Sequence, residues 1–314
     1  MLRTDAECVE KDLTIVTSSF EVSDLDVRVW GARGSMPASG AKFDAFGGET
    51  SCVELRVPLE DGTERVIVID AGSGILALGK ILEDEGVREI DLVFSHLHYD
   101  HIMGFPFFAP VHNPDVRLRI HYGGNEHAPS TNEALEASLQ DYLRQPFFPV
   151  GMDCFRADIS THVLPSEGLA LDGVPNLSIE HRALCHPGGA TGYRFEHNGS
   201  VFAYITDFEH DGSSFDENVL FLARNADLAL MDATFTPEDY LPCAGWGHAN
   251  WKACGELAMR AGTKNWGLFH HQHERTDDEI RLIEREARRL FPNAFAARVG
   301  QRFALANGVR QHAV

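Results

Sequence analysis

Residues 91–108, DLVFSHLHYDHIMGFPFF, join a short apolar run to a dense group of side chains that can bind metal. His96, His98, Asp100 and His101 follow the pattern H-x-H-x-D-H. Three imidazoles and one carboxylate offer the nitrogen and oxygen donors that borderline divalent cations such as zinc prefer. A histidine-rich tract can also be a solvated loop, but four donors placed directly after an apolar run favour a metal site.

A buried strand is expected to position these donors. Residues 92–94 are apolar and flanked by polar residues, which is typical of a short strand buried on both faces. Alternation along the extended chain would place His96 and His98 on one side. Gly104 and Pro106 then predict that a new element begins after the motif.

Three further donors each end an apolar run later in the chain, and they are His186, Asp207 and His270. One metal ion needs about four donors, and a two-metal hydrolase needs more, including a shared bridge. His271 lies next to His270, but alternation would send the two side chains to opposite sides, and His270 is the predicted ligand. Asp70 also ends an apolar run, and we expect it at the same sheet edge.

The motif resembles the signature of the metallo-β-lactamase superfamily, and the resemblance extends over about residues 25–293. It implies an α/β fold, the αββα four-layer sandwich, and two divalent metal ions. Zinc is the first expectation, with Mn²⁺ or Fe²⁺ as alternatives. By resemblance, one ion is held by His96, His98 and His186, the other by Asp100, His101 and His270, and Asp207 bridges them.

Several segments resemble the ribonuclease Z-like phosphodiesterase branch: WGARGS at 30–35, GGETS at 47–51, DAGSG at 70–74 and GYR at 192–194. That branch has a catalytic histidine just before a helix, where this chain has His248. The alternative for His248 is a solvated ring at a helix start. The redox di-iron branch is expected to carry a carboxylate at the position of His98, so His98 favours hydrolysis. Asp100 would supply a carboxylate to the second metal, which disfavours the cysteine-ligated site of a lactamase.

The resemblance implies hydrolysis of a phosphodiester by a hydroxide that bridges the metals, with Asp100 and His248 as catalytic residues. His248 would protonate the leaving oxygen, a step worth roughly 10²–10⁴-fold in rate. Asp70 would accept an imidazole N–H from a ligand histidine. Two alternatives stay open, a thioesterase of the glyoxalase II type, which would not need His248, and a non-catalytic metal-binding protein.

The composition describes an ordinary globular chain of 314 residues, 44 % hydrophobic and 24 % charged. We expect residues 1–24 to be an extension and residues 25–314 to form one hydrolase domain.

The net charge of −20 opposes bulk electrostatic capture of nucleic acid or anionic membrane. No apolar run is long enough to span a membrane. Six cysteines without a C-x-x-C pair indicate reduced thiols and a cytoplasmic protein.

The size of the substrate follows from what the chain lacks. Ribonuclease Z-like enzymes that process transfer RNA carry a basic, Gly/Pro-rich arm, and the candidate insert at residues 153–175 is neither basic nor glycine-rich. A small phosphodiester such as a cyclic nucleotide or a ribosyl cyclic phosphate is therefore expected. Residues 145–149, QPFFP, would pack either as a lid over the site or as core, and burial of apolar stretches favours core. The resemblance also implies a homodimer.

The expected strands cover residues 25–30, 52–57, 65–70, 92–94, 116–122, 154–162, 177–184, 192–196, 201–206, 228–232 and 265–270. The expected helices cover residues 75–85, 131–143, 250–261 and 277–290, with Thr131 as an N-cap. Clustered strands with helices at intervals predict two sheets covered by helices.

Overall fold

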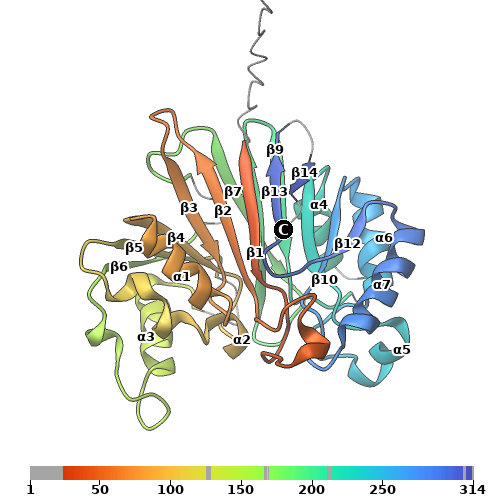
Figure 1. Ribbon diagram of the computed structural model, residues 1–314, viewed down its shortest axis with the longest axis horizontal. Helices are drawn as coiled ribbons and strands as arrows, with labels where there is room; N and C mark the ends of the chain where they lie inside the picture. The colour runs from red at the N-terminus through yellow and green to blue at the C-terminus, as the bar shows by residue number, and fades with distance from the viewer. Residues whose placement is uncertain are drawn as a thin grey trace, which may run out of the picture.

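Two β-sheets pack face to face, and helices cover the outer face of each sheet (Figure 1). The computed structural model describes residues 24–124, 129–165, 168, 170–210, 212, 214–306 and 309–312. The four layers confirm the predicted αββα sandwich. The expected extension, apart from Asp24, lies outside the described residues.

The first sheet has eight strands. In spatial order they are β14 (Val309–His312), β13 (Arg302–Leu305), β1 (Leu25–Gly31), β2 (Cys52–Pro58), β3 (Glu64–Ile69), β4 (Glu89–Phe94), β5 (Arg117–Tyr122) and β6 (Asp158–Val163). Strands β3 to β6 run parallel, and the others pair antiparallel. Helices α1 (Ile75–Asp84) and α3 (Asn132–Tyr142) pack on its outer face.

The second sheet has six strands. Their order is β12 (Ala294–Ala296), β11 (Trp266–Phe269), β10 (Leu228–Asp232), β9 (Ser200–Ile205), β8 (Ala190–His197) and β7 (Leu177–Leu184). Strands β9 to β12 run parallel, whereas β7, β8 and β9 alternate in direction. Helices α4 (Ser214–Ala223), α6 (Trp251–Ala261) and α7 (Asp277–Leu290) cover its outer face.

Alternating side chains of the strands fill three large cores, one between the sheets and one under the helices on each outer face. In β4, Val93 packs between the sheets, while Leu92 and Phe94 pack under the helices. Burial on both faces explains why the parallel strands read as apolar runs. Thr131 caps α3 as predicted, accepting a hydrogen bond from the backbone N–H of Ala134 at 3.2 Å.

Short helices lie in the loops between strands of the same sheet. They are α2 (Tyr99–Ile102), α5 (Pro237–Tyr240), η1 (Ala41–Phe43), η2 (Phe105–Phe107), η3 (Ala109–His112), η4 (Met152–Cys154) and η5 (Leu241–Cys243). The sequence patterns did not predict α4, α5 or strands β12, β13 and β14. These strands have three or four residues each, too few to show a period.

The interpretation of residues 145–149 as core is wrong. Phe147 is 77 % exposed, and the flanking Pro146 and Pro149 are exposed as well. The core below α3 is filled by Leu135 and Leu139 instead, and Leu143 ends the buried face of that segment. The two prolines interrupt regular structure, so the chain leaves the layer before Phe147 can pack into it.

Two further expectations can be compared with the described residues. The cysteines among them, Cys52, Cys154, Cys185, Cys243 and Cys254, form no disulfide. Within the described ranges, no helix combines the length and apolar character needed to cross a membrane.

Candidate metal centre and active site

The carboxyl ends of the central strands of both sheets meet at one edge of the sandwich. In the first sheet, Asp70 follows β3, and the H-x-H-x-D-H motif follows the parallel neighbour β4. In the second sheet, Asp207 and His270 follow the parallel strands β9 and β11. Strand β7 is antiparallel to β8, which is antiparallel to β9, so β7 delivers His186 to the same edge. The fold therefore brings all seven predicted ligand residues together.

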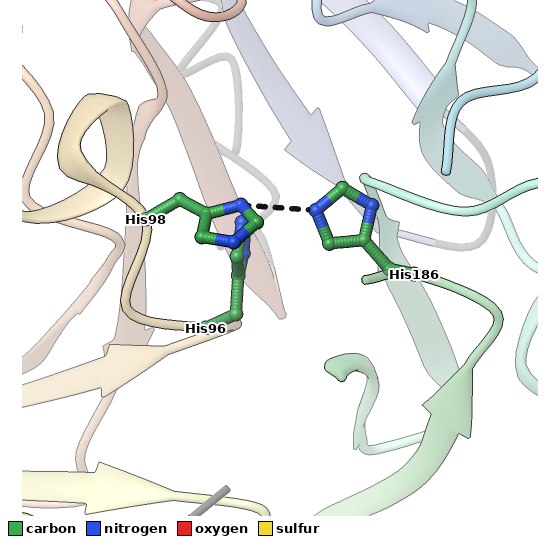
Figure 2. A group of neighbouring side chains, drawn as sticks. All are labelled: His96, His98 and His186. Carbon is green, nitrogen blue, oxygen red and sulfur yellow. Dashed lines mark hydrogen bonds between the residues drawn. The ribbon is translucent and has the colours of Figure 1, made fainter. Parts of the chain in front are cut away.

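The first donor group joins the two sheets. His96 and His98 come from the chain after β4, and His186 reaches toward them from the opposite side (Figure 2). One ring nitrogen of each of the three lies within 4.8 Å of the others. The Nδ1 atom of His98 lies 3.1 Å from the Nε2 atom of His186. This trio matches the set predicted for the first ion.

The second donor group lies beside the first. The Oδ2 atom of Asp100 lies 3.1 Å from His270 Nε2 and 3.4 Å from His101 Nε2. The two imidazole nitrogens are themselves 3.4 Å apart. His271, by contrast, points away and contacts the carbonyl oxygen of Ala297 through Nε2 at 2.8 Å, which confirms the predicted register.

Asp207 lies between the two groups. Its Oδ1 atom is 3.8 Å from Nε2 of both His96 and His186. The same carboxylate approaches the second group, with Oδ2 at 3.2 Å from His101 Nε2 and Oδ1 at 3.3 Å from His270 Nε2. A carboxylate in this position can bridge two cations.

These residues fit a pair of divalent metal ions. The Nε2 atom of His96 is buried and has no hydrogen-bond partner among the described residues, although buried polar atoms normally have one. Burial lowers the pKa of His96 well below its usual value, which keeps the ring neutral and able to bind a metal. Burial also lowers the pKa of His101, but the carboxylates of Asp207, Asp100 and Asp70 outweigh it and raise that pKa. Such a concentration of carboxylates attracts positive charge.

Hydrogen bonds through Nδ1 orient three of the ligand histidines. Asp70 accepts from Nδ1 of His101 at 2.7 Å, as predicted, and the backbone carbonyl of Gly247 accepts from Nδ1 of His186 at 2.8 Å. The hydroxyl of Thr234 lies 3.0 Å from Nδ1 of His270. These contacts leave Nε2 of each ring facing the centre, the arrangement that metal-binding histidines normally show.

Asp70 is itself held from two sides. The backbone N–H and the hydroxyl of Ser95 donate to its two oxygens at 2.7 and 2.8 Å, and the hydroxyl of Tyr204 donates at 2.8 Å. All three residues are fully buried. Ser95 and Tyr204 were not singled out in the sequence, because nothing in their local pattern distinguishes them from ordinary core residues.

Three of the site residues adopt a left-handed backbone that residues other than glycine rarely show. The φ angles are 60° at Asp70, 58° at Asp207 and 59° at His270. Each follows directly or within two residues of a strand end. Such backbone geometry costs of order 1–3 kcal/mol per residue and is concentrated at functional sites. The sharp turn directs each side chain to the centre.

His248 lies at the rim of both donor groups. Its Nδ1 atom is 2.8 Å from the buried Oδ2 of Asp232, at the end of β10. Its ring stacks on that of His270 at 4.9 Å between centroids and meets that of His186 edge-on at 5.2 Å. Burial lowers the pKa of His248, but the Asp232 carboxylate outweighs it and raises the pKa to about 9. Asp232 was missed in the sequence, although it ends an apolar strand as Asp207 does.

Glu209 organises the loop that carries His248. Its carboxylate accepts hydrogen bonds from the backbone N–H groups of Gly245 and Gly247 and from the hydroxyl of Tyr240, at 2.7–3.0 Å. The carbonyl of Gly247 in turn orients His186. This residue was also missed, since a single glutamate after a strand carries no local signal.

Two known proteins are similar to this chain in sequence. A ribonuclease Z from Exiguobacterium sibiricum is 26 % identical over 244 residues, covering 66 % of this chain and 79 % of that protein. A ribonuclease Z from Gemmatimonas aurantiaca is 33 % identical over 90 residues, but this match covers 29 % of this chain and 28 % of that protein.

A solved structure shows the same fold. The metallo-β-lactamase fold protein YhfI from Bacillus subtilis superposes with a TM-score of 0.65 at 19 % identity, covering 89 % of this chain and 98 % of that one. The family model of the β-lactamase superfamily domain matches residues 65–271, which include every predicted ligand and His248. The chain therefore belongs to the β-lactamase superfamily, as a metal-dependent hydrolase with the metallo-β-lactamase fold.

Proposed function

We propose that this protein hydrolyses a small phosphodiester at a centre of two divalent metal ions, with His248 as general acid. The ligands would be the seven residues named from the sequence: His96, His98, Asp100, His101, His186, Asp207 and His270. Zinc is the expected metal, with Mn²⁺ or Fe²⁺ as alternatives. The chemistry supplied by such a metal pair is activation of water and neutralisation of charge on the phosphoryl oxygens.

The pairing of His248 with Asp232 is the observation that carries this proposal. Because Asp232 engages Nδ1, the other ring nitrogen can carry a second proton. One ring nitrogen of His248 lies within 4.8 Å of ligand atoms of His186 and Asp207, and Nδ1 is 3.8 Å from Oδ1 of Asp207. A proton at that position can pass to the leaving oxygen, and an alkoxide leaving group needs one. Asp100, fixed between His101 and His270, would hold the second ion rather than move a proton.

The size of the substrate is argued from the whole chain. The relatives named ribonuclease Z are, by that name, enzymes that cleave RNA. This chain has a net charge of −20, which opposes binding of a large polyanion. A cyclic nucleotide or a ribosyl cyclic phosphate therefore fits better than a folded RNA. A cytoplasmic location and a homodimer stay predictions from the sequence.

Hydrolysis of bis(p-nitrophenyl) phosphate, measured beside a thioester, tests the proposal. The protein is loaded with zinc or manganese and its metal content is determined. We expect phosphodiester turnover that disappears in Asp207→Ala. Thioester turnover alone would assign the protein to the glyoxalase II type and leave His248 without a role. Full metal loading without turnover of phosphodiester, thioester, ester or lactam would indicate a non-catalytic metal-binding protein.

A further inference from the structure

Large aromatic side chains stand exposed beside the donor groups, although most of the chain's aromatic residues are buried. Tyr99 is 73 % exposed and Trp246 is 64 % exposed. Each is next in sequence to a residue of the site, since Tyr99 lies between His98 and Asp100, and Trp246 precedes Gly247 and His248. Both exposed rings therefore belong to segments that also carry residues of the candidate centre.

Tyr99 and Trp246 lie on two different segments, one that carries His98 of the first donor group and one that hydrogen-bonds to His186. His98 and His186 approach each other from the two sheets, with 3.1 Å between their ring nitrogens (Figure 2). Tyr99 directly follows His98. Trp246 directly precedes Gly247, whose carbonyl binds His186 at 2.8 Å. Each of the two histidines that meet between the sheets is therefore joined, by sequence or by a hydrogen bond, to a segment with an exposed aromatic ring.

Tyr99 packs against a second aromatic ring. It is the first residue of α2, and its neighbours His98 and Asp100 face the centre. Its ring packs on that of Tyr142 at the end of α3, with 6.0 Å between centroids and 38° between planes. An aromatic ring fixed in this way loses little conformational entropy when a ligand stacks on it.

Trp246 is held through its backbone. Glu209 accepts hydrogen bonds from the N–H groups on both sides, those of Gly245 and Gly247. The backbone N–H of Trp246 donates to the carbonyl of Cys243 at 3.0 Å. Gly247 also packs directly on His186, because a Cβ built there would lie 2.4 Å from its Nδ1 atom. The loop thus presents a large exposed ring from a fixed backbone.

We propose that Tyr99 and Trp246 are stacking platforms for planar bases, so that the substrate of the proposed phosphodiesterase, on which this inference rests, is a nucleotide rather than a base-free sugar phosphate. Every nucleobase has a π-face, and stacking on aromatic side chains is a common way in which proteins bind nucleotides in single strands. Stacking also requires no positive surface, which suits a chain with a net charge of −20. Of the two small substrates named above, it selects the cyclic nucleotide.

A matched pair of esters tests the platforms. Thymidine 5′-(p-nitrophenyl phosphate) and methyl p-nitrophenyl phosphate share a leaving group and differ in the base-bearing arm. We expect wild-type kcat/KM to favour the thymidine ester. That preference should fall by roughly 5- to 150-fold in Tyr99→Ala or Trp246→Ala, the range that loss of one stacked base produces. Tyr99→Phe and Trp246→Phe keep a ring and should restore the preference.

The control variant is Met259→Ala, which removes an exposed apolar side chain near the end of α6 remote from His248. It should leave the preference unchanged. An unchanged preference in both Tyr99→Ala and Trp246→Ala would overturn the inference. Sedimentation would show a second contradictory outcome. If the variants convert a dimer to a monomer and leave the preference unchanged, the rings belong to an interface between two copies, and the inference is overturned.

Calorimetric binding separates this inference from the proposed function. The probes are thymidine 5′-monophosphate and methyl phosphate, titrated into the metal-loaded protein. If the protein cleaves neither ester, the proposed function fails, yet tighter binding of the nucleotide that is lost in Tyr99→Ala or Trp246→Ala would still support the platforms. Equal affinity for both probes would overturn them.

Discussion

His248 and the ligand histidines show how one ring nitrogen decides the role of the other. In His101, His186 and His270 a hydrogen bond at Nδ1 leaves Nε2 to face the centre. In His248 the Nδ1 partner is a buried carboxylate, Asp232, which favours a second proton on the ring. The same side chain can therefore serve as a neutral ligand or as a proton donor, according to its partner.

Removal of the proton donor should affect turnover and leave the metals in place. We expect His248→Ala to lower kcat by roughly 10²–10⁴-fold for a diester with an alkoxide leaving group. The loss should be much smaller for bis(p-nitrophenyl) phosphate, because p-nitrophenolate leaves without needing a proton. Asp232→Asn should show the same substrate dependence in weaker form. Loss of metal from His248→Ala, or equal loss with both substrates, would contradict the assignment of a general acid.

At the scale of elements, the loops after the strands hold the side chains in place through close backbone packing. Residues 31–36 run beside the end of β11, and the N–H of Gly34 donates to the carbonyl of His271 at 2.9 Å. A Cβ built on Gly34 would lie 2.2 Å from the ring of His270. The GARG segment that resembled the ribonuclease Z-like branch therefore has a steric reason in this fold.

Gly34→Ala should weaken metal binding although it replaces no ligand residue. The new methyl group must displace the His270 ring, and misplaced metal ligands typically cost 10–100-fold in affinity. Zinc content after gel filtration and a competitive titration with a chelator would measure the loss. Gly62→Ala is the control, because a Cβ there meets nothing within 4 Å, although its φ of 82° strains the backbone. This control substitution should lower the stability of the protein and leave its zinc affinity unchanged. Normal zinc affinity in Gly34→Ala would contradict the steric argument.

Strands β3, β4 and β5 are joined by a second polar cluster, away from the donor groups, centred on the buried Asp91. Asp91 accepts hydrogen bonds from Nε of Arg119 at 2.9 Å and Nε2 of His121 at 2.8 Å, and Arg65 lies 3.5 Å away. Burial raises the pKa of Asp91, but the bonds from His121 and Arg119 outweigh it and hold the pKa below its usual 3.8.

Asp91→Asn should destabilise the protein in a pH-dependent way. Breaking a buried ion pair costs about 3–5 kcal/mol, and we expect that loss near pH 7. Because the folded-state pKa is depressed, the carboxylate stabilises the fold above pH 3.8, and this stabilisation is lost as the pH falls through the lower folded-state value. Urea unfolding of wild type and variant between pH 7 and 3 measures the difference.

The control for Asp91 is Glu89→Gln. Glu89 pairs with the same arginines, but its side chain is about half exposed, so the change should cost less than about 1 kcal/mol. Equal costs for the two variants would show that burial of Asp91 does not set its contribution.

At the scale of the whole molecule, the candidate centre joins two sheets that otherwise meet mainly through apolar packing. His96, His98, Asp100 and His101 come from the first sheet, and His186, Asp207 and His270 come from the second. Metal ions held between them would bind the folded chain and not the unfolded one, since the unfolded chain holds no such arrangement of donors.

Removal of metal should therefore lower the thermal stability of the whole protein. At a free metal concentration 100 times the Kd, binding adds about 2.7 kcal/mol to the free energy of unfolding. Calorimetric scans of chelated and zinc-loaded protein should differ by several degrees in Tm. His98→Ala, which removes one donor of the first group, should shrink this difference. An identical Tm with and without metal would mean that the donors do not hold ions across the two sheets.

The sequence by itself determined the fold class, and it singled out eight residues that the fold brings together, because each follows a short apolar strand or precedes a helix that local patterns reveal. The adjacent choice between His270 and His271 also followed from alternation alone. By contrast, residues 145–149 were misassigned, because apolar composition does not say whether a segment finds a layer to pack against.

Only the tertiary structure decided which residues support the site. Asp232, Glu209, Tyr204 and Thr234 contact partners that lie up to 134 residues away in the chain, and their local sequence does not distinguish them from ordinary core or loop residues. The exposure of Tyr99 and Trp246 was equally hidden, because a sequence shows that a residue is aromatic and not what covers it. Strand ends are encoded locally, whereas the contacts between loops depend on how both sheets close on each other.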